Sequence, residues 1–281
     1  MAASLFRGIG PGSQPGEEDG GDLQYMEMPK VMATSAAPVL PEKENVAGLE
    51  AALAVLSALA ESLGRCSLDC ENAVHDLSPL DRANRALIDQ ALGEGEVSII
   101  CGEDLQAQES VLAGVWRVRQ TGPDGRLVRD FVDVGAFPAA VLERAFAGCR
   151  NTLVGPATYP MGVLNAPPLI SELNDRIPLV GPGIGPHVIN LSLLPHTEQD
   201  LTFLDGLLGH GPVVVLSRGY GNCRVTTTAT RGVWWVRFFN SSDDLILNTI
   251  EVTALPEVVR AAPEDIADSR QRLLEILEVY R

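Results

Sequence analysis

The order of hydrophobic and polar residues predicts an α+β protein in which one structural unit occurs twice. Residues 208–252 are dense in β-branched and aromatic residues and are interrupted by Gly, Asn, Ser and Asp. This pattern is typical of a small antiparallel sheet with tight connections. Residues 92–134 repeat it, and self-similarity is a stronger guide to architecture than any single motif. Each unit is expected to contain a helix, an antiparallel sheet of three to four strands and a second helix, with the two units arranged pseudo-symmetrically.

The two units can be matched position by position. Val97 corresponds to Val213, 116 positions later, whereas Gly114 corresponds to Gly232, 118 positions later. The second unit therefore carries two extra residues, and these fall in residues 217–224. Further matches run from the helix of each unit to the residues after the last strand, and include Asp89 with Asp205, Leu92 with Leu208, Trp116 with Trp234, Arg119 with Arg237, and Pro138 with Pro256.

Four segments follow from this repeat. Residues 1–43 are rich in Gly, Pro and acids and are expected to be extended or partly disordered, with residues 23–29 as a possible docking strand. Residues 44–148 form the first unit with an N-terminal helix, and residues 187–281 form the second unit with a C-terminal helix that should dock on its own sheet. Residues 149–186, rich in Pro and Gly, are the linker and contain one short helix.

Helical periodicity, capping residues and β-propensity give the expected elements. Ser78 is expected to cap the helix of the first unit, with Pro79 at its first position, and Thr197 to cap the helix of the second. Helices are predicted over residues 45–63, 79–92, 139–147, 168–176 and 198–208 and from 263 onward, and strands over 96–101, 110–120, 126–134, 187–193, 213–217, 223–230, 233–240 and 244–252.

Composition narrows the classes of function. The chain has 281 residues and a net charge of −16, which argues against a nucleic-acid partner because affinity for phosphates rests on clustered Lys and Arg. The start of the chain has no secretory signal pattern, and the most apolar helix is too short to span a bilayer. Five cysteines at irregular spacing give no disulfide framework. We therefore expect a cytoplasmic protein that does not insert into a membrane.

Motifs for catalysis or cofactor binding are absent from the sequence. It has no phosphate-binding loop, dinucleotide fingerprint, HExxH zinc motif or nucleophile elbow. We therefore predict no enzyme, no catalytic residue and no cofactor.

The most unusual segment is RGYGNCR, and it is the candidate partner-binding loop. It comprises Arg218, Gly219, Tyr220, Gly221, Asn222, Cys223 and Arg224. Glycines let the backbone approach another chain closely, and arginines offer paired donors to carboxylates or carbonyls. Three interpretations remain open: a glycine-rich connection between strands with a buried Cys223, a recognition loop, and a catalytic or metal-binding Cys223.

Three further residues carry weaker hypotheses. Cys66 and Cys70, with His75 beyond them, have one pair of a zinc-site pattern but lack the second pair; with Cys223 they are only weak metal candidates.

Trp234 and Trp235 point to opposite faces of one strand. Because Trp116 corresponds to Trp234, we assign Trp234 to the core and Trp235 either to an exposed binding face or to packing under the C-terminal helix.

Several of these segments carry a family resemblance. LSRGYGNCR, GVWWVRFFN, LILNTIEV and the C-terminal LPEVVRAAPEDIADSRQRLLEILEVYR resemble the HupH/HyaF-type hydrogenase expression/formation proteins. The likeness continues upstream through PHVINLSLLP, LNAPPL and LGEGEVS to GPGSQP and YMEMP, and so covers nearly the whole chain. It implies an accessory protein for maturation of a [NiFe]-hydrogenase, and it brings no catalytic residue with it.

The resemblance also implies partners. They are the precursor of the iron–sulfur small subunit, before its twin-arginine-dependent export, and a thioredoxin-like companion of the HyaE type. An acidic protein without enzyme motifs suits a holder of a precursor with a basic leader, because electrostatics sets encounter rate and specificity. The alternative is an iron–sulfur or redox accessory that uses Cys223, with Cys66 and Cys70, to deliver or protect clusters.

Overall fold

The computed structural model describes residues 48–66, 71–181, 183–219 and 221–280. The predicted N-terminal segment therefore lies outside the described residues, as do Cys70 and Tyr220. The described strands are β1 (Ala73–Asp76), β2 (Val97–Cys101), β3 (Leu105–Glu109), β4 (Val115–Thr121), β5 (Leu127–Val134), β6 (His187–Asn190), β7 (Val213–Ser217), β8 (Asn222–Thr227), β9 (Val233–Phe239) and β10 (Leu245–Val252). The α-helices are α1 (Glu50–Arg65), α2 (Arg82–Leu92), α3 (Ala139–Ala145), α4 (Ala166–Arg176), α5 (Glu198–Leu208) and α6 (Pro263–Val279).

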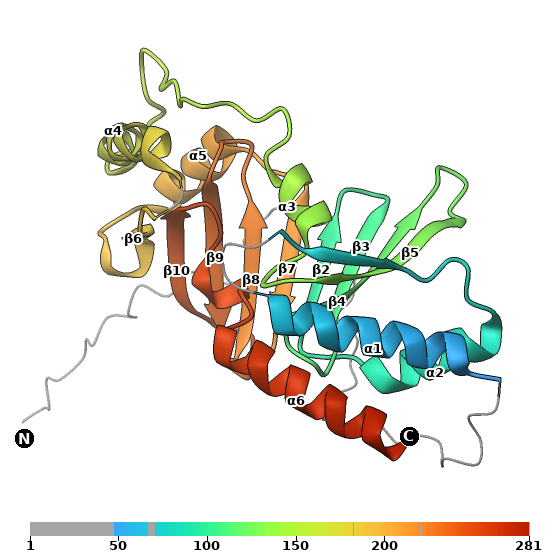
Figure 1. The fold of residues 1–281 in the computed structure, drawn as a ribbon. Coiled ribbons are helices and arrows are strands. Elements are labelled where there is room, and N and C mark those ends of the chain that lie inside the picture. The colour runs from blue at the N-terminus through green and yellow to red at the C-terminus, as the bar shows by residue number, and fades with distance from the viewer. Residues whose placement is uncertain (1–47, 67–70, 182, 220, 281) are drawn as a thin grey trace, which may run out of the picture. The chain divides into compact units, whose positions relative to one another are not determined.

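All ten strands join one sheet, in the order β1-β5-β4-β3-β2-β7-β8-β9-β10-β6 (Figure 1). The α+β class is confirmed, but the expected separate sheets of three to four strands are wrong. The halves meet through the antiparallel pair β2–β7. Pairing the two units satisfies the backbone groups that two separate sheets would leave open at their edges.

Each half contributes five strands in the same order. The first strand of each half lies outside the last, so that β1 pairs with β5 and β6 pairs with β10. At the junction Ile99 pairs with Val215, 116 positions later, and these residues occupy the same position in the two units. Corresponding tryptophans also make corresponding bonds: Trp116 Nε1 donates to the Gly135 carbonyl at 3.0 Å and Trp234 Nε1 to the Thr253 carbonyl at 3.1 Å.

Local chemistry explains where the matching helices begin and end. Thr197 caps α5 in a capping box with Asp200, as predicted. The expected cap at Ser78 is wrong: Asp81 caps α2 by accepting from the Asn84 amide. Both helices end at a glycine with positive φ, Gly93 at 54° and Gly209 at 65°, where a side chain would be strained.

Several elements differ from the prediction; β4, for example, begins at Val115 and not at residue 110. Strands β1 and β3 were not expected, because AVHD and LQAQE have weak β-propensity and are stabilised by their neighbours. The predicted strand over residues 187–193 stops at Asn190, whose side chain accepts from the Ser192 amide, and Leu191–Leu193 form a 3-10 turn. The hairpin between β4 and β5 turns at residues 122–125, where the Gly125 amide donates to the Gly122 carbonyl at 2.9 Å.

Buried residues form three clusters on the two faces of the sheet. One face carries a cluster under α1, α2 and α6, containing Val115 and Val132, and another under α4 and α5, containing Val233 and Ile250. The opposite face carries the third cluster, which contains both core tryptophans and is partly covered by α3. The predicted linker therefore includes α4, whose buried face forms part of the second-half core.

The C-terminal helix does not cover its own half of the sheet, contrary to expectation. Helix α6 packs along α1 on the first-half side (Figure 1), and Ile266, Leu273 and Leu277 join that core. Gly114, with φ of 78°, is the contact point: a Cβ there would lie 2.7 Å from Ile266 Cγ1. The second half is instead covered by α4 and α5, so its hydrophobic face is already filled.

Candidate interaction surface

A strip that none of the described helices covers crosses the middle of the sheet on the face that carries α2 and α5. The register places Ser98 and Ile100 of β2 and Val214 and Leu216 of β7 on this face. All four side chains are half-buried. We call this surface the central strip; it also includes the neighbouring side chains of β3 and β8, which are Gln106, Gln108, Arg224 and Thr226.

The aliphatic residues of the central strip belong to no core cluster of the described residues. Ile100, Val214 and Leu216 are absent both from the buried clusters and from the residues packed against them. In the centre of a sheet, neighbouring side chains on four sides limit exposure even where nothing covers the face. Their partial exposure is therefore that of a sheet face over which none of the described residues packs.

Arginines border the central strip on both sides. On β4, Arg117 lies 2.8 Å from Asp89 (Nη1 to Oδ1) and 2.7 Å from Asp130 (Nη2 to Oδ2). On β9, Arg237 lies over Trp235, 4.6 Å from the ring centroid, and 4.0 Å from Asp205. Asp89 and Asp205 are equivalent residues of α2 and α5, so each half presents an aspartate toward the strip.

The predicted RGYGNCR loop is only partly a loop: Asn222, Cys223 and Arg224 belong to β8, and the described residues Arg218, Gly219 and Gly221 lie between β7 and β8, at one end of the central strip. Arg218, Gly219 and Gly221 are exposed, and Gly221 has a φ of 95°. The Arg218 amide donates to the Glu96 carbonyl at 3.2 Å, and a Cβ at Gly219 would collide with the Glu96 carboxylate. The glycine at position 219 thus permits the close approach of Glu96. Arg224 faces the strip itself, and Asn222 donates to Asp243 at 3.4 Å.

Cys223 points to the opposite face and is 3% exposed. Burial, with the Glu251 carboxylate as a smaller cause, raises the pKa of its thiol to about 12. A thiol with such a pKa is protonated at neutral pH, whereas metal ligands and nucleophiles are thiolates. The structure therefore does not present Cys223 as a reactive or metal-binding group.

Of the other two weak metal candidates, only Cys66 has a described position. Cys66 is half-buried, and Cys70 lies outside the described residues. His75 Nε2 lies 2.9 Å from the Ser62 hydroxyl. Among the residues with described positions, no group of three or more His, Cys, Asp or Glu side chains is arranged to hold a metal ion.

Trp235 is not an exposed binding anchor. It is 4% exposed and packs in the second-half cluster with α4 and α5, not under α6, so both expectations for this residue are wrong. Its indole donates to the Asn248 side chain. At the equivalent positions in the first half, Arg117 pairs with Asp130, so the same pair of sites carries an ion pair in one half and a hydrogen bond in the other.

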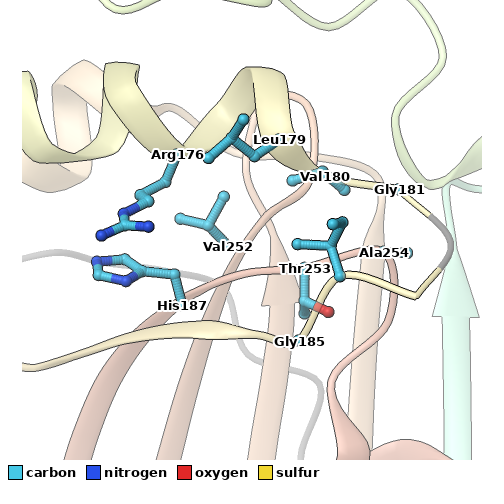
Figure 2. A pocket seen from close by; sticks show the side chains of 10 residues that line it. Arg176, Leu179, Val180, Gly181, Gly185, His187, Val252, Thr253 and Ala254 are labelled. Carbon is cyan, nitrogen blue, oxygen red and sulfur yellow. The ribbon is translucent and has the colours of Figure 1, made fainter.

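A small cavity lies beside β6, which is one edge strand of the sheet (Figure 2). The Arg176 guanidinium lies next to the His187 ring at its mouth, and His187 Nε2 is 2.7 Å from Glu172 Oε1. The cavity has a volume of about 40 Å³. That is room for a few waters or a small anion, far below the several hundred Å³ of a typical ligand pocket.

A half-buried carboxylate, Glu109, lies at the end of β3. Burial raises its pKa to about 7, the backbone bond from Gly114 lowers it, and the negative charges of Glu96 and Asp265 raise it further. Glu96 is also the residue beside Gly219, so this titration occurs close to the exposed loop. Glu109 follows Gln108 of the strip and pairs with Trp116, so its side chain belongs to the opposite face of β3.

Sequence reasoning missed the central strip, although a signal was present. Strands β2 (VSIIC) and β7 (VVVLS) are apolar at consecutive positions, which is typical of strands with both faces covered. One face of each strand enters the core, whereas the other lies in the strip. No helix among the described residues is both long enough and apolar enough to cross a membrane.

A model of a known protein family matches most of the chain. The family described as "HupH hydrogenase expression protein, C-terminal conserved region" matches residues 49–146 and residues 163–280, that is, both halves. A solved structure, hydrogenase expression protein HupH from Thiobacillus denitrificans, is 32% identical, with a TM-score of 0.39, over 41% of this chain and 95% of that chain.

Full-length relatives are similar over almost the entire chain. Hydrogenase expression/formation protein HupH of Rhodobacter capsulatus is 49% identical over 98% of this chain and 96% of its own length. Hydrogenase expression/formation protein HoxQ of Cupriavidus necator is 46% identical over 96% and 95%, respectively. Hydrogenase-1 operon protein HyaF of Escherichia coli is 32% identical over 99% and 97%. The chain therefore belongs to the HupH family of hydrogenase expression/formation proteins.

Proposed function

We propose that this accessory protein binds the iron–sulfur small-subunit precursor of a [NiFe]-hydrogenase in the cytoplasm and holds it until export. The observation that carries the proposal is family membership over the whole chain, together with an open sheet face that is suited to a polypeptide. A thioredoxin-like protein of the HyaE type is the companion we propose for this step.

The fold supports a scaffold rather than a catalyst. We infer that two copies of one unit are related by an approximate two-fold axis between Ile99 and Val215, since these equivalent residues face each other. Such a duplicated sheet provides a wide, rigid surface, and binding sites concentrate on loops and faces held by a rigid scaffold. The side chains that we identify on this surface are suited to contact with another chain.

The negative charge of the chain supports recognition of the precursor leader, at a surface other than the central strip. The net charge of −16 would attract a basic twin-arginine leader over long range and raise the encounter rate. Because such attraction is screened by salt, association with the precursor should weaken as ionic strength rises. The leader would meet the acidic surface, whereas the arginine-bordered strip would repel it.

The redox alternative finds no support in the thiols. Cluster delivery through Cys223 requires a thiolate at the surface, but Cys223 is buried and its pKa is raised to about 12. Cys66 is part of no group of described side chains that could hold a metal ion. We therefore retain client binding as the proposed function.

The test is co-purification of the tagged full-length chain from cells that make the hydrogenase. We expect the small-subunit precursor in the eluate, and its loss when the small-subunit gene is deleted. The same experiment with a precursor that lacks its leader distinguishes contact through the leader from contact through the rest of the subunit. Lower recovery of the leaderless form at low salt would identify the leader as part of the contact. Equal recovery of the two forms would exclude leader recognition, and absence of the precursor from wild-type eluates would overturn the proposal.

A further inference from the structure

The central strip has the dimensions and chemistry of a receptor for a helix. We propose that it docks an amphipathic helix of a partner polypeptide, with aliphatic residues on one side and carboxylates along its flanks. The strip contains Ile100, Val214 and Leu216 between two arginine-bearing borders. The helix need not belong to the small-subunit precursor, because the strip selects it by its apolar and charged side chains.

The spacing of the strands leaves room for one helix. From β4, beside α2, to β9, beside α5, there are five steps between neighbouring strands. At roughly 4.8 Å per step the two strands are about 24 Å apart. With α2 centred over β4 and α5 over β9, each helix would occupy about 5 Å of this width, and about 14 Å would remain for an added helix of about 10 Å diameter. A helix there would complete the layer that α2 and α5 begin on this face.

The floor of the strip supplies the apolar contact. Ile100 and Leu216 are equivalent residues on β2 and β7, and Val214 lies beside Ile100 across the junction. These three side chains pack against no core cluster of the described residues. Helices pair with sheets by burying an apolar stripe on such a face. An incoming helix would therefore meet aliphatic side chains along its centre line.

The borders select the charge of the partner. Five arginines (Arg85, Arg117, Arg119, Arg224 and Arg237) and three aspartates (Asp89, Asp130 and Asp205) lie on or pair with the borders, a local balance of +2. The whole chain has a net charge of −16. Arg119 is 53% exposed, and guanidinium groups bind carboxylates with paired hydrogen bonds. The strip is thus a cationic surface on an acidic protein, and it favours an acidic helix.

Site-specific photo-crosslinking in cells that assemble the hydrogenase tests the inference. The full-length chain would carry p-benzoylphenylalanine at position 216 in one preparation and at position 100 in another. We expect an adduct at both positions, and mass spectrometry should map it to a helical segment with aliphatic residues and carboxylates. The double variant Arg119→Glu/Arg237→Glu should reduce the adduct roughly tenfold or more, because both charged borders would then repel the segment.

Matched variants control for folding and for non-specific contact. The same probe at Val128, an exposed residue of β5 outside the strip, should give no adduct with that segment. The melting temperature of the double variant must be measured with it, because Arg237 is only 26% exposed and lies over Trp235. The single variant Arg119→Glu, at a side chain that is 53% exposed, should keep the wild-type melting temperature within a few degrees and should still weaken the adduct. An adduct with a basic segment, with a second copy of this chain or with the same chain would overturn the inference, as would no adduct at either strip position.

The two proposals fail in different ways. If the adduct maps to an acidic helix of a protein other than the small subunit, the docking surface is supported and the proposed client is wrong. If the precursor co-purifies equally well with the charge-reversed variant and no adduct forms at the strip, the client stands and the docking surface is wrong.

Discussion

Ile99 of β2 pairs directly with Val215 of β7, and these two residues hold the same position in the two halves of the chain. Both are buried in the cluster shared by the halves, with Ile99 only 1% exposed. The junction is therefore part of one continuous core. The two repeats should unfold together, because separating them would expose this core.

The first prediction uses neighbouring isoleucines on opposite faces of β2. Ile99→Ala should lower the free energy of unfolding by about 2–5 kcal/mol, because it leaves a cavity in a close-packed core. Ile100→Ala should cost less, since Ile100 lies on the open strip. Urea denaturation followed by circular dichroism measures both. Equal losses for the two variants would show that the strip face is covered.

A buried ion pair in the first half gives the second prediction. Asp130 is buried and binds the Arg117 guanidinium through both carboxylate oxygens. Asp130→Ala removes one partner of this pair, and the loss of stability should be about 3–5 kcal/mol. The exposed pair between Asp124 and Arg126 provides the control, and Asp124→Ala should leave the denaturation midpoint almost unchanged. A small effect of Asp130→Ala would mean that Asp89 alone satisfies Arg117.

Hydrophobic periodicity and internal matching predicted most strands and helices of both halves, because these depend on local patterns. They did not predict that β2 and β7 would pair, because either strand could have been an edge of its own sheet. The partner of α6 was also missed: its apolar face with Ile266 and Leu273 suits either half, and the choice depends on α4 and α5 already filling the second. Trp235 was misassigned for the same reason, since the helices that bury it include part of the presumed linker.

The third prediction concerns pH. Burial raises the pKa of Glu109 in the folded state to about 7, whereas the ordinary value is 4.5. The folded state therefore binds the proton more tightly than the unfolded state, and this contribution to stability is complete below pH 4.5 and is lost as the pH rises through 7. Glu109→Gln should flatten this part of the stability profile and stabilise the protein at pH 8 by on the order of 1 kcal/mol, since water screens the half-buried group.

Thermal denaturation between pH 5 and pH 8 measures this effect, with Glu103→Gln as a control because Glu103 is an exposed residue. The same slope in the Glu109→Gln variant and in the wild type would assign the pH dependence to other groups.

The fourth prediction concerns the thiols. Cys223 should react with iodoacetamide far more slowly than Cys66 and Cys149 at pH 7.5, because it is buried and its pKa is raised, whereas the other two are half-buried. Peptide mapping before and after unfolding in urea gives the order of labelling. Rapid labelling of native Cys223 would show that the β7–β8 hairpin opens in solution and would revive a redox role.

The central claim is that the chain recognises a hydrogenase small-subunit precursor. Its most direct measurement is a titration of purified full-length protein against purified precursor, followed by fluorescence anisotropy at low and high salt. We predict saturable binding that weakens as salt increases, with weaker binding of the leaderless form at low salt. No saturable binding of the precursor at either salt concentration would contradict the account.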